Sequence, residues 1–150
     1  MNSGRAIAFA GSCETRGLPG DKSLANFDLK RLPTKVSRQM KVLLEGGFLE
    51  RKENLLAFGN PGAGKSHLLC AIAQELISSQ RRKIKYTTCA LLVQDLLVAK
   101  RELQLRQEIK KLAKYEGLVI DQMGYVQQSR EEMEFCSRFW RSVTNVAVCC

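Results

Sequence analysis

The chain contains the stretch Gly59-Asn60-Pro61-Gly62-Ala63-Gly64-Lys65-Ser66, which fits the pattern G-x-x-x-x-G-K-[ST]. This pattern is typical of a loop that wraps the phosphates of a nucleotide, because its glycines let backbone N–H groups converge on phosphate oxygens. Residues 54–58 before it form a run of the length of a buried strand, and residues 67–78 after it are apolar at helical spacing. A strand and a helix on either side are the context that the motif requires, and they argue against a chance match.

The motif predicts the roles of individual residues in a Mg-ATP site. Lys65 is expected to reach the β- and γ-phosphates, and the Ser66 hydroxyl is expected to bind Mg²⁺. A second apolar run ends in an acid at Asp121, which fits a Walker B strand whose aspartate lies beside the loop and holds the Mg²⁺ shell. The alternative is an ordinary aspartate at a strand end. The predicted nucleotide-binding residues are Gly59, Asn60, Pro61, Gly62, Ala63, Gly64, Lys65, Ser66 and His67.

Composition limits the partners and the compartment. The chain has 150 residues, 45% of them hydrophobic, and a net charge of +9, which favours anionic partners such as nucleic acid over a merely soluble basic surface. We expect the six cysteines to be reduced and the protein to be cytoplasmic, because no convincing signal segment precedes them. No cysteine pair has C-x-x-C spacing, and no apolar run is long enough to span a membrane.

The order of elements predicts an α/β protein with a parallel sheet. We expect a poorly ordered leader over residues 1–21, a helix that ends at Gly46-Gly47, and a connection over 48–53 into the first strand. Residues 84–88 are β-branched and aromatic enough for a second strand, and 118–121 form a third. Between these two strands, residues 91–115 predict one long amphipathic helical tract.

The polar side of that tract is basic. It is either a solvated helix face or a contact for DNA, and the absence of interleaved aromatic residues makes sequence-specific recognition unexpected. The candidate DNA contacts are Lys100, Arg101, Arg106, Lys110 and Lys111.

Three blocks in order resemble the IstB-type ATP-binding proteins, which assist insertion-sequence transposition and are related to the DnaC helicase loaders of the AAA+ class. The blocks are residues 54–68, 92–103 and 121–134, and the resemblance covers about residues 22–134. It implies a P-loop NTPase fold of AAA+ type, with ATP and Mg²⁺ as cofactors. It further implies an oligomer, with itself or a paralogue, that acts on DNA and recruits a cognate transposase.

One departure from the family concerns hydrolysis. The family usually has a second acid after the Walker B aspartate, whereas this chain has Gln122, which cannot take a proton from the attacking water. Lys65 and Asp121 remain in the catalytic set, and a glutamine can still orient a water, so slow turnover stays open. We therefore expect ATP binding without efficient hydrolysis.

The second departure is residues 135–150, which do not resemble the family and carry three of the six cysteines. One missing base after the Glu134 codon would explain this tail, because the restored frame can encode the family's next helix and strand; the alternative is a genuine but divergent tail. In the AAA+ arrangement that the chain resembles, the next strand lies between the first strand and the Walker B strand. We therefore expect a C-terminally truncated fold with an incomplete sheet and weak ATP binding, although 143–150 is apolar enough to fill the gap.

Two other functions are compatible with the sequence. A replication protein resembling the DnaC helicase loaders would share the same motifs. A non-catalytic remnant that interferes with intact paralogues would explain both Gln122 and the unusual tail.

Overall fold

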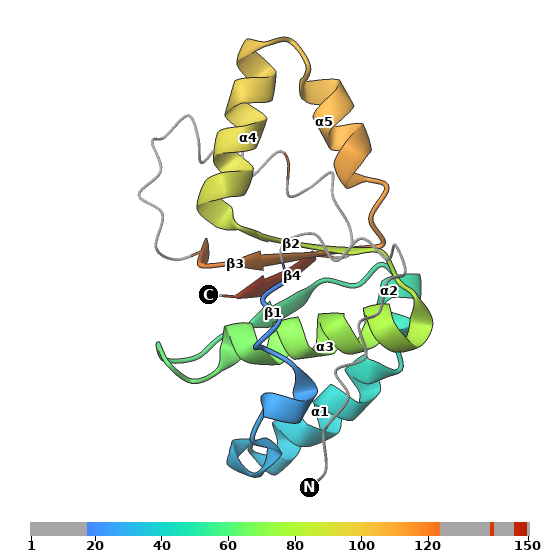
Figure 1. Ribbon diagram of the computed structural model, residues 1–150, viewed down its shortest axis with the longest axis vertical. Coiled ribbons are helices and arrows are strands. Elements are labelled where there is room, and N and C mark those ends of the chain that lie inside the picture. Colours follow the sequence, from blue (N-terminus) through green and yellow to red (C-terminus); the bar gives the residue numbers. More distant parts are fainter. Residues whose placement is uncertain (1–17, 124–138, 140–145, 150) are drawn as a thin grey trace, which may run out of the picture.

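A computed structural model describes residues 18–123, 139 and 146–149 of the chain. Two short 3-10 turns, η1 and η2, precede helices α1 and α2, and the α/β core follows (Figure 1). The elements are η1 (Leu24–Asn26), η2 (Leu29–Arg31), α1 (Thr34–Leu44), α2 (Gly47–Glu50), β1 (Leu55–Ala57), α3 (Lys65–Gln80), β2 (Ile84–Thr88), α4 (Cys89–Arg101), α5 (Leu105–Leu112), β3 (Gly117–Asp121) and β4 (Val146–Cys149).

The sheet is parallel, with strand order β1-β4-β3-β2. The predicted strands at 54–58, 84–88 and 118–121 correspond to β1, β2 and β3. The expectation of an incomplete centre is wrong, because β4 lies between β1 and β3 and pairs with both. This segment is apolar and rich in valine, and its pairing satisfies backbone groups that β1 and β3 would otherwise leave open.

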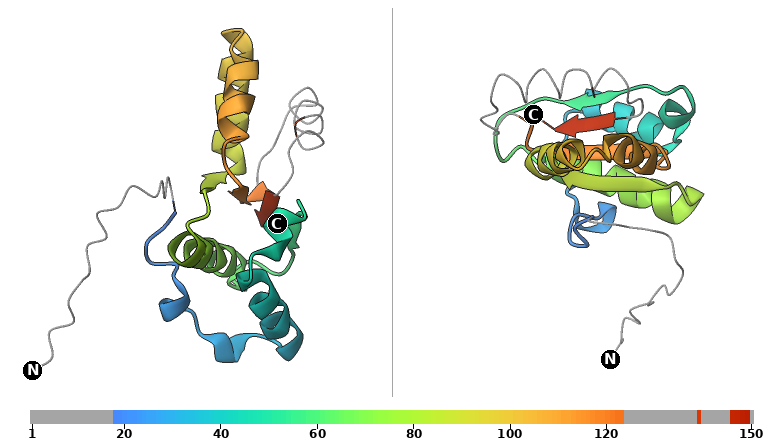
Figure 2. Two further views of the ribbon diagram at one scale, coloured as in Figure 1. Left: turned by 90° about the vertical axis from the view of Figure 1, so that its right-hand side faces the viewer. Right: turned by 90° about the horizontal axis from the view of Figure 1, so that it is seen from above.

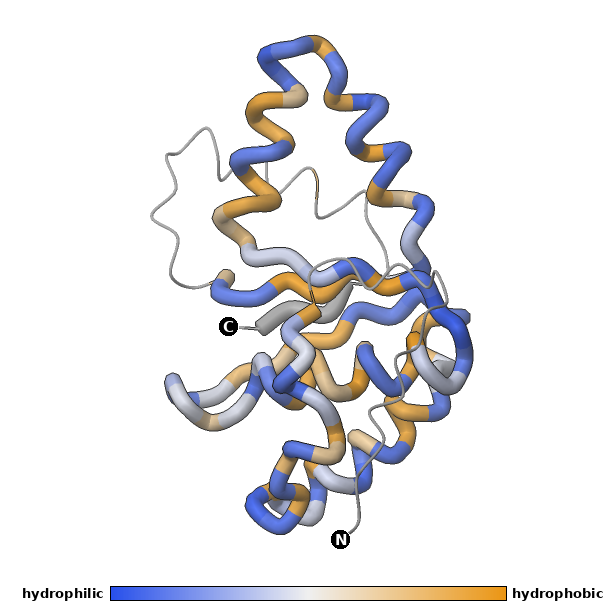
Figure 3. The backbone as a smooth tube through the Cα atoms, in the orientation of Figure 1, coloured by the Kyte–Doolittle hydropathy of each residue, from blue (hydrophilic) through white to orange (hydrophobic). Residues whose placement is uncertain are grey.

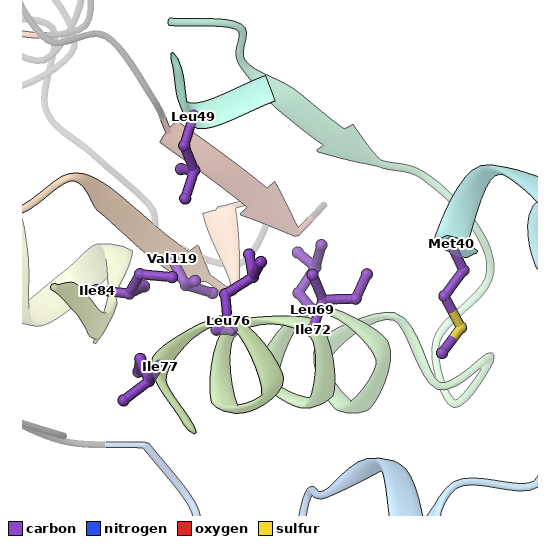
Figure 4. Close-up of a cluster of buried hydrophobic side chains, with 9 residues drawn as sticks. Met40, Leu49, Leu69, Ile72, Leu76, Ile77, Ile84 and Val119 are labelled. Carbon is purple, nitrogen blue, oxygen red and sulfur yellow. The ribbon is translucent and has the colours of Figure 1, made fainter. Parts of the chain in front are cut away.

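Helices cover both faces of the sheet, as Figures 1 and 2 show. Successive side chains along each strand point to opposite faces, so each strand can contribute apolar side chains to both helical layers. Val119 packs on one face with the inner side of α3, whereas Leu118 and Ile120 pack on the other face with α4 and α5. The α3 side of the core is drawn in Figure 4 and also includes side chains of α1 and α2. Its buried members are Met40, Leu49, Leu69, Ile72, Ala73, Leu76, Ile77, Ile84 and Val119.

The predicted single helical tract over 91–115 is two helices. The chain reverses at residues 102–104, where Leu103 adopts a left-handed conformation with φ of +58°, and α5 returns along α4 (Figure 1). Leu105, Ile109 and Leu112 of α5 pack against the cluster that contains Leu92 and Leu96 of α4. Folding back buries both apolar stripes against each other, which a straight helix could not do.

The segments before β1 also differ in detail from the expectation. Residues 47–50 form the short helix α2 on the path to β1. Within the expected leader, Leu18 packs against the α3 side of the core, and Gln74 of α3 donates a hydrogen bond to the Pro19 carbonyl at 2.6 Å. Residues 1–17 and most of the tail at 135–150 lie outside the described residues.

A polar network connects the residues that directly precede β2 and β3. The Arg82 guanidinium contacts Glu116 at 3.0 Å and Glu50 of α2 at 2.6 Å. The Lys83 backbone amide donates to the second Glu116 carboxylate oxygen at 2.9 Å. These contacts fix the amino ends of β2 and β3, and therefore the register that brings Asp121 to the opposite edge.

Candidate functional site

The phosphate loop connects β1 to the first turn of α3, as the motif predicts. Gly62 and Gly64 have φ of +79° and +82°, in the left-handed region that costs other residues steric energy. A Cβ atom at Gly62 would meet no atom within 4 Å, so the backbone conformation is the reason that favours glycine there. The sixteen-residue α3 begins at Lys65 directly behind this loop, and the backbone N–H groups of its first turn and its dipole favour an anion at this end.

Lys65 reaches back over the loop. Its ammonium donates hydrogen bonds to the carbonyl oxygens of Gly59 at 2.8 Å and Asn60 at 3.1 Å, in an exposed position. These carbonyls hold the cation at the mouth of the loop, where a phosphate could exchange for them as its partner. The predicted loop residues 59–66 are therefore brought together in one structure.

Asp121 is the buried acid beside the loop. Its side chain is 4% exposed, and it accepts the Ser66 hydroxyl at 2.7 Å, although the two residues are 55 positions apart in the chain. The Gln122 backbone amide donates to the same carboxylate oxygen at 2.8 Å. The predicted pair of Mg²⁺ ligands, Ser66 and Asp121, is thus in direct contact.

Tyr86 is a site residue that sequence reasoning missed. Its phenol donates to the second Asp121 carboxylate oxygen at 2.8 Å. The parallel register pairs Tyr86 with Val119 and Thr88 with Asp121, so Tyr86 and Asp121 lie on the same face of the sheet, two positions apart diagonally. A tyrosine is long enough to span that diagonal, and its only signal in the sequence is its position in the strand before the acid.

His67 faces the segment that precedes α1. Its Nε2 lies 3.2 Å from the Ser23 carbonyl oxygen, and its ring packs edge-on against Phe27 with centroids 5.0 Å apart. Phe27 also lies close to the loop, because a Cβ on Gly64 would come within 3.7 Å of its ring. The η1 segment therefore borders the phosphate loop through Phe27 and His67.

Gln122 departs from regular strand geometry. It follows β3 with φ of +61°, and its side chain is exposed while its backbone amide bonds Asp121. Its side chain is a neutral amide, so position 122 does not supply a carboxylate that could accept a proton.

The predicted DNA contacts lie on α4 and α5, away from the phosphate loop. All five cations are exposed, and Lys111 forms an ion pair with Glu108 of the same helix. The two helices project from the sheet as a hairpin (Figures 1 and 2). Because the tract reverses, Lys100 and Arg101 end one helix while Arg106, Lys110 and Lys111 lie on the next.

The donor chemistry of the site fits Mg²⁺. A serine hydroxyl and one carboxylate are hard oxygen ligands, and Mg²⁺ is usually held by one or two carboxylates together with substrate phosphates. Among residues 18–123, 139 and 146–149, no three His, Cys, Asp or Glu side chains form a metal-binding group. The hydroxyl and carboxylate of Ser66 and Asp121 suit a cation that arrives with a nucleotide.

Among the helices of residues 18–123, 139 and 146–149, none has the length and apolarity of a membrane span.

Comparison with known protein families matches residues 8–139 to the family described as IstB-like ATP binding protein. The chain belongs to this family. An insertion-sequence ATP-binding protein of Sinorhizobium fredii is 40% identical to this IstB-like chain over 116 residues, which are 77% of the chain and 39% of the relative. One of Geobacillus stearothermophilus is 37% identical over 109 residues, 73% of the chain and 43% of the relative. The chain thus spans less than half the length of these relatives.

Solved structures support the fold of this IstB-like chain. AMPPCP-bound DnaA from Aquifex aeolicus superposes with a TM-score of 0.72 at 14% identity, over 89% of this chain and 43% of that one. The DnaC helicase loader gives a TM-score of 0.69 at 18% identity, over 83% and 76% of the two chains. The predicted AAA+ P-loop architecture is confirmed.

Proposed function

We propose that this chain binds Mg-ATP and, through it, controls contact with DNA and a transposase during insertion-sequence transposition. The observation that carries the proposal is the 2.7 Å contact between Ser66 and Asp121 beside the Lys65 loop. It joins the end of β3 to the start of α3 at the point where the loop presents its N–H groups. The relatives named as insertion-sequence ATP-binding proteins support the same reading.

In the bound state the loop amides and the α3 amino terminus hold the phosphates. Lys65 exchanges the Gly59 and Asn60 carbonyls for phosphate oxygens, which are stronger acceptors because they are charged. Ser66 and Asp121 hold Mg²⁺, which supplies charge neutralisation at the phosphates. Completion of the sheet by β4 removes one reason to expect weak binding, the incomplete sheet.

Hydrolysis is slow in this proposal. The neutral side chain of Gln122 can orient a water by hydrogen bonding, but it cannot take the proton of that water at neutral pH. ATP binding itself needs no proton transfer. In this proposal, ATP binding and not ATP hydrolysis controls the contact with DNA and the transposase.

The DNA contact is the basic surface of the α4–α5 hairpin. Five exposed cations on two adjacent helices can neutralise backbone phosphates without reading bases. Binding is therefore expected to be non-specific and strongly dependent on salt. Self-association, or association with a paralogue, would align several such hairpins along one duplex.

The nucleotide site is tested by measuring the affinity of a fluorescent ATP analogue with and without Mg²⁺ in the wild type and in Ser66→Ala. We expect the variant to lose most of the Mg²⁺ enhancement and to keep its Mg²⁺-free affinity. Ser78→Ala is the matched control, because Ser78 is an exposed serine of the same helix whose hydroxyl donates to the Glu75 carbonyl. Equal Mg²⁺ enhancement in wild type and Ser66→Ala would reject the proposed metal ligand.

The DNA surface is tested by the salt dependence of duplex binding. Arg106→Ala and Lys110→Ala together are expected to lower the slope of log affinity against log salt by about 2, roughly one for each lost phosphate contact. Lys35→Ala with Arg38→Ala removes the same charge from α1, which lies at the opposite end of the molecule in Figure 1. An equal drop in both double variants would show that net charge, and not the hairpin, governs binding.

A further inference from the structure

Leu103 combines two unfavourable properties at the turn between α4 and α5. Its φ is +58°, in the left-handed region where glycine or asparagine is the usual residue after a helix. Its side chain is 93% exposed, the highest value among the exposed large hydrophobic residues of the described chain. A left-handed conformation is uncommon for a residue other than glycine, and here that residue is also an almost fully exposed leucine. The combination suggests that the side chain is kept for contact with something else.

The backbone conformation follows from the way α4 ends. The Gln104 amide donates to the Ala99 carbonyl at 2.7 Å, and the Leu103 amide donates to the Lys100 carbonyl at 3.2 Å. These bonds satisfy the last carbonyls of α4 and turn the chain toward α5. The turn therefore needs a left-handed residue at position 103, but nothing in its hydrogen bonding needs a leucine there.

Acidic side chains gather on one side of the hairpin. Asp95, Glu102 and Glu108 line a groove between α4 and α5, and none of the five candidate DNA-binding cations lines it. Arg101 and Arg106 are exposed on either side of Leu103 in the sequence. In Figure 3 the end of the hairpin is mostly hydrophilic, with a short hydrophobic segment at its apex.

The apex also lies far from the rest of the molecule. The thirteen residues of α4 run out from the carboxyl end of β2, so the turn is displaced from the sheet by about 20 Å at 1.5 Å per residue. Figure 2 shows the hairpin standing clear of the remaining elements in a second view. A single side chain at this apex can enter a space that a whole helix cannot.

We propose that Leu103 is a wedge that enters the minor groove and partly separates two stacked base pairs, while the hairpin cations hold the phosphates on either side. This inference rests on the proposed DNA contact and adds to it a distortion of the duplex. Leucine is one of the apolar residues that proteins insert between base steps to kink DNA, at the cost of unstacking. The neighbouring arginines favour DNA over an apolar pocket on a protein partner, because they would be desolvated there without a counter-charge.

The experiment uses the full chain with Mg-ATP and a short duplex in which several adenines are replaced by 2-aminopurine, whose fluorescence rises when the base unstacks. Affinity is measured on the same duplex by anisotropy. The variants are Leu103→Gly, which suits the left-handed turn and removes the wedge, and Leu103→Met, which keeps an apolar side chain of similar length. Leu91→Ala is the matched control, because Leu91 is an exposed leucine, 55% accessible, near the start of α4.

We expect the wild type, Leu103→Met and Leu91→Ala to raise the fluorescence, and Leu103→Gly to lose most of that rise. We expect the affinity of Leu103→Gly for DNA to fall by less than about tenfold, because phosphate contacts supply most of the binding. Its melting temperature without DNA should rise, since glycine relieves the left-handed strain. This combination separates a binding role from a folding role.

Two results would overturn the proposal. If the duplex binds the wild type without a rise in fluorescence, or if Leu103→Gly produces the same rise, Leu103 is not a wedge, although the DNA contact stands. If the wild type does not bind the duplex at low salt, the wedge and the proposed DNA surface both fail.

Discussion

The phosphate loop and the α4–α5 hairpin each follow a strand of the same parallel sheet, but they are specified in different ways. The loop conformation depends on glycines at two left-handed positions and on the start of the helix directly behind it. The hairpin reverses at Leu103, where no glycine, proline or asparagine marks a turn. Local chemistry thus determines the loop, whereas burial of two apolar stripes determines the hairpin.

The strongest test of this contrast is Leu96→Ala in the buried seam of the hairpin. Leu96 is 1% exposed and packs with residues of α4, α5 and the sheet, so we expect a loss of about 2–5 kcal/mol in the free energy of unfolding. Urea unfolding measures it. Leu91→Ala on the exposed side of the same helix should change this free energy by less than about 0.5 kcal/mol. Similar losses in the two variants would mean that helix propensity, and not packing, holds the hairpin.

A second variant tests the loop. Lys65→Ala removes a charged donor from the mouth of the loop, and we expect ATP affinity to fall by about 10–100-fold, the loss of one charge-assisted hydrogen bond to phosphate. The free energy of unfolding without nucleotide should change by less than about 0.5 kcal/mol, because the two carbonyls that the Lys65 ammonium bonds are exposed. Lys41→Ala on α1 is the matched control in an ATP titration. An unchanged affinity in Lys65→Ala would separate the motif from its expected function.

Tyr86→Phe tests a contact that belongs to neither region alone. The Tyr86–Asp121 hydrogen bond exists because the register of β2 and β3 brings the two side chains together. Removal of the phenol leaves one oxygen of the buried Asp121 without this donor, and we expect a loss of about 1 kcal/mol in unfolding free energy. ATP affinity should weaken in the presence of Mg²⁺ and not in its absence, because the phenol orients the carboxylate and touches no phosphate. Tyr115→Phe is the same chemical change elsewhere, and an equal effect there would exclude a positioning role.

The smallest change in unfolding free energy is expected for Glu116, at the edge of the sheet opposite Asp121. Partial burial acts to raise the pKa of Glu116, but hydrogen bonds from the Lys83 amide and the Arg82 guanidinium outweigh it, and the net pKa lies below the ordinary value. Because the folded pKa is the lower one, this stabilisation is complete above about pH 4.3 and is lost as the pH falls through the lowered pKa. With 42% of the Glu116 side chain exposed, we expect less than about 1 kcal/mol.

Urea unfolding of Glu116→Gln and the wild type across this pH range checks the prediction. The difference in unfolding free energy between them should be largest near neutral pH and should shrink in acid. Glu45→Gln, at an exposed glutamate, is the control. A difference that grows in acid would reverse the sign that we assign to the Glu116 contacts.

Sequence reasoning was most successful where a function imposes a short pattern. The loop, Lys65, Ser66 and Asp121 were all predicted, and the structure brings them into one site. Tyr86 was missed because its role depends on the diagonal neighbour across β2 and β3, and no spacing along the chain encodes that distance. The roles of His67 and Gln122 in nucleotide binding and hydrolysis remain predictions.

The P-loop, the alternation of strands and helices, and the family could be predicted from the sequence, because these depend on residues that are close in the chain. The structure was needed to show that residues 146–149 complete the sheet between β1 and β3, and that the basic tract folds back on itself. Strand order and helix reversal are set by which apolar surfaces and backbone groups find partners far away in the chain. The spacing of apolar residues along the chain shows that a helix face must be buried, but it does not show which other element covers that face.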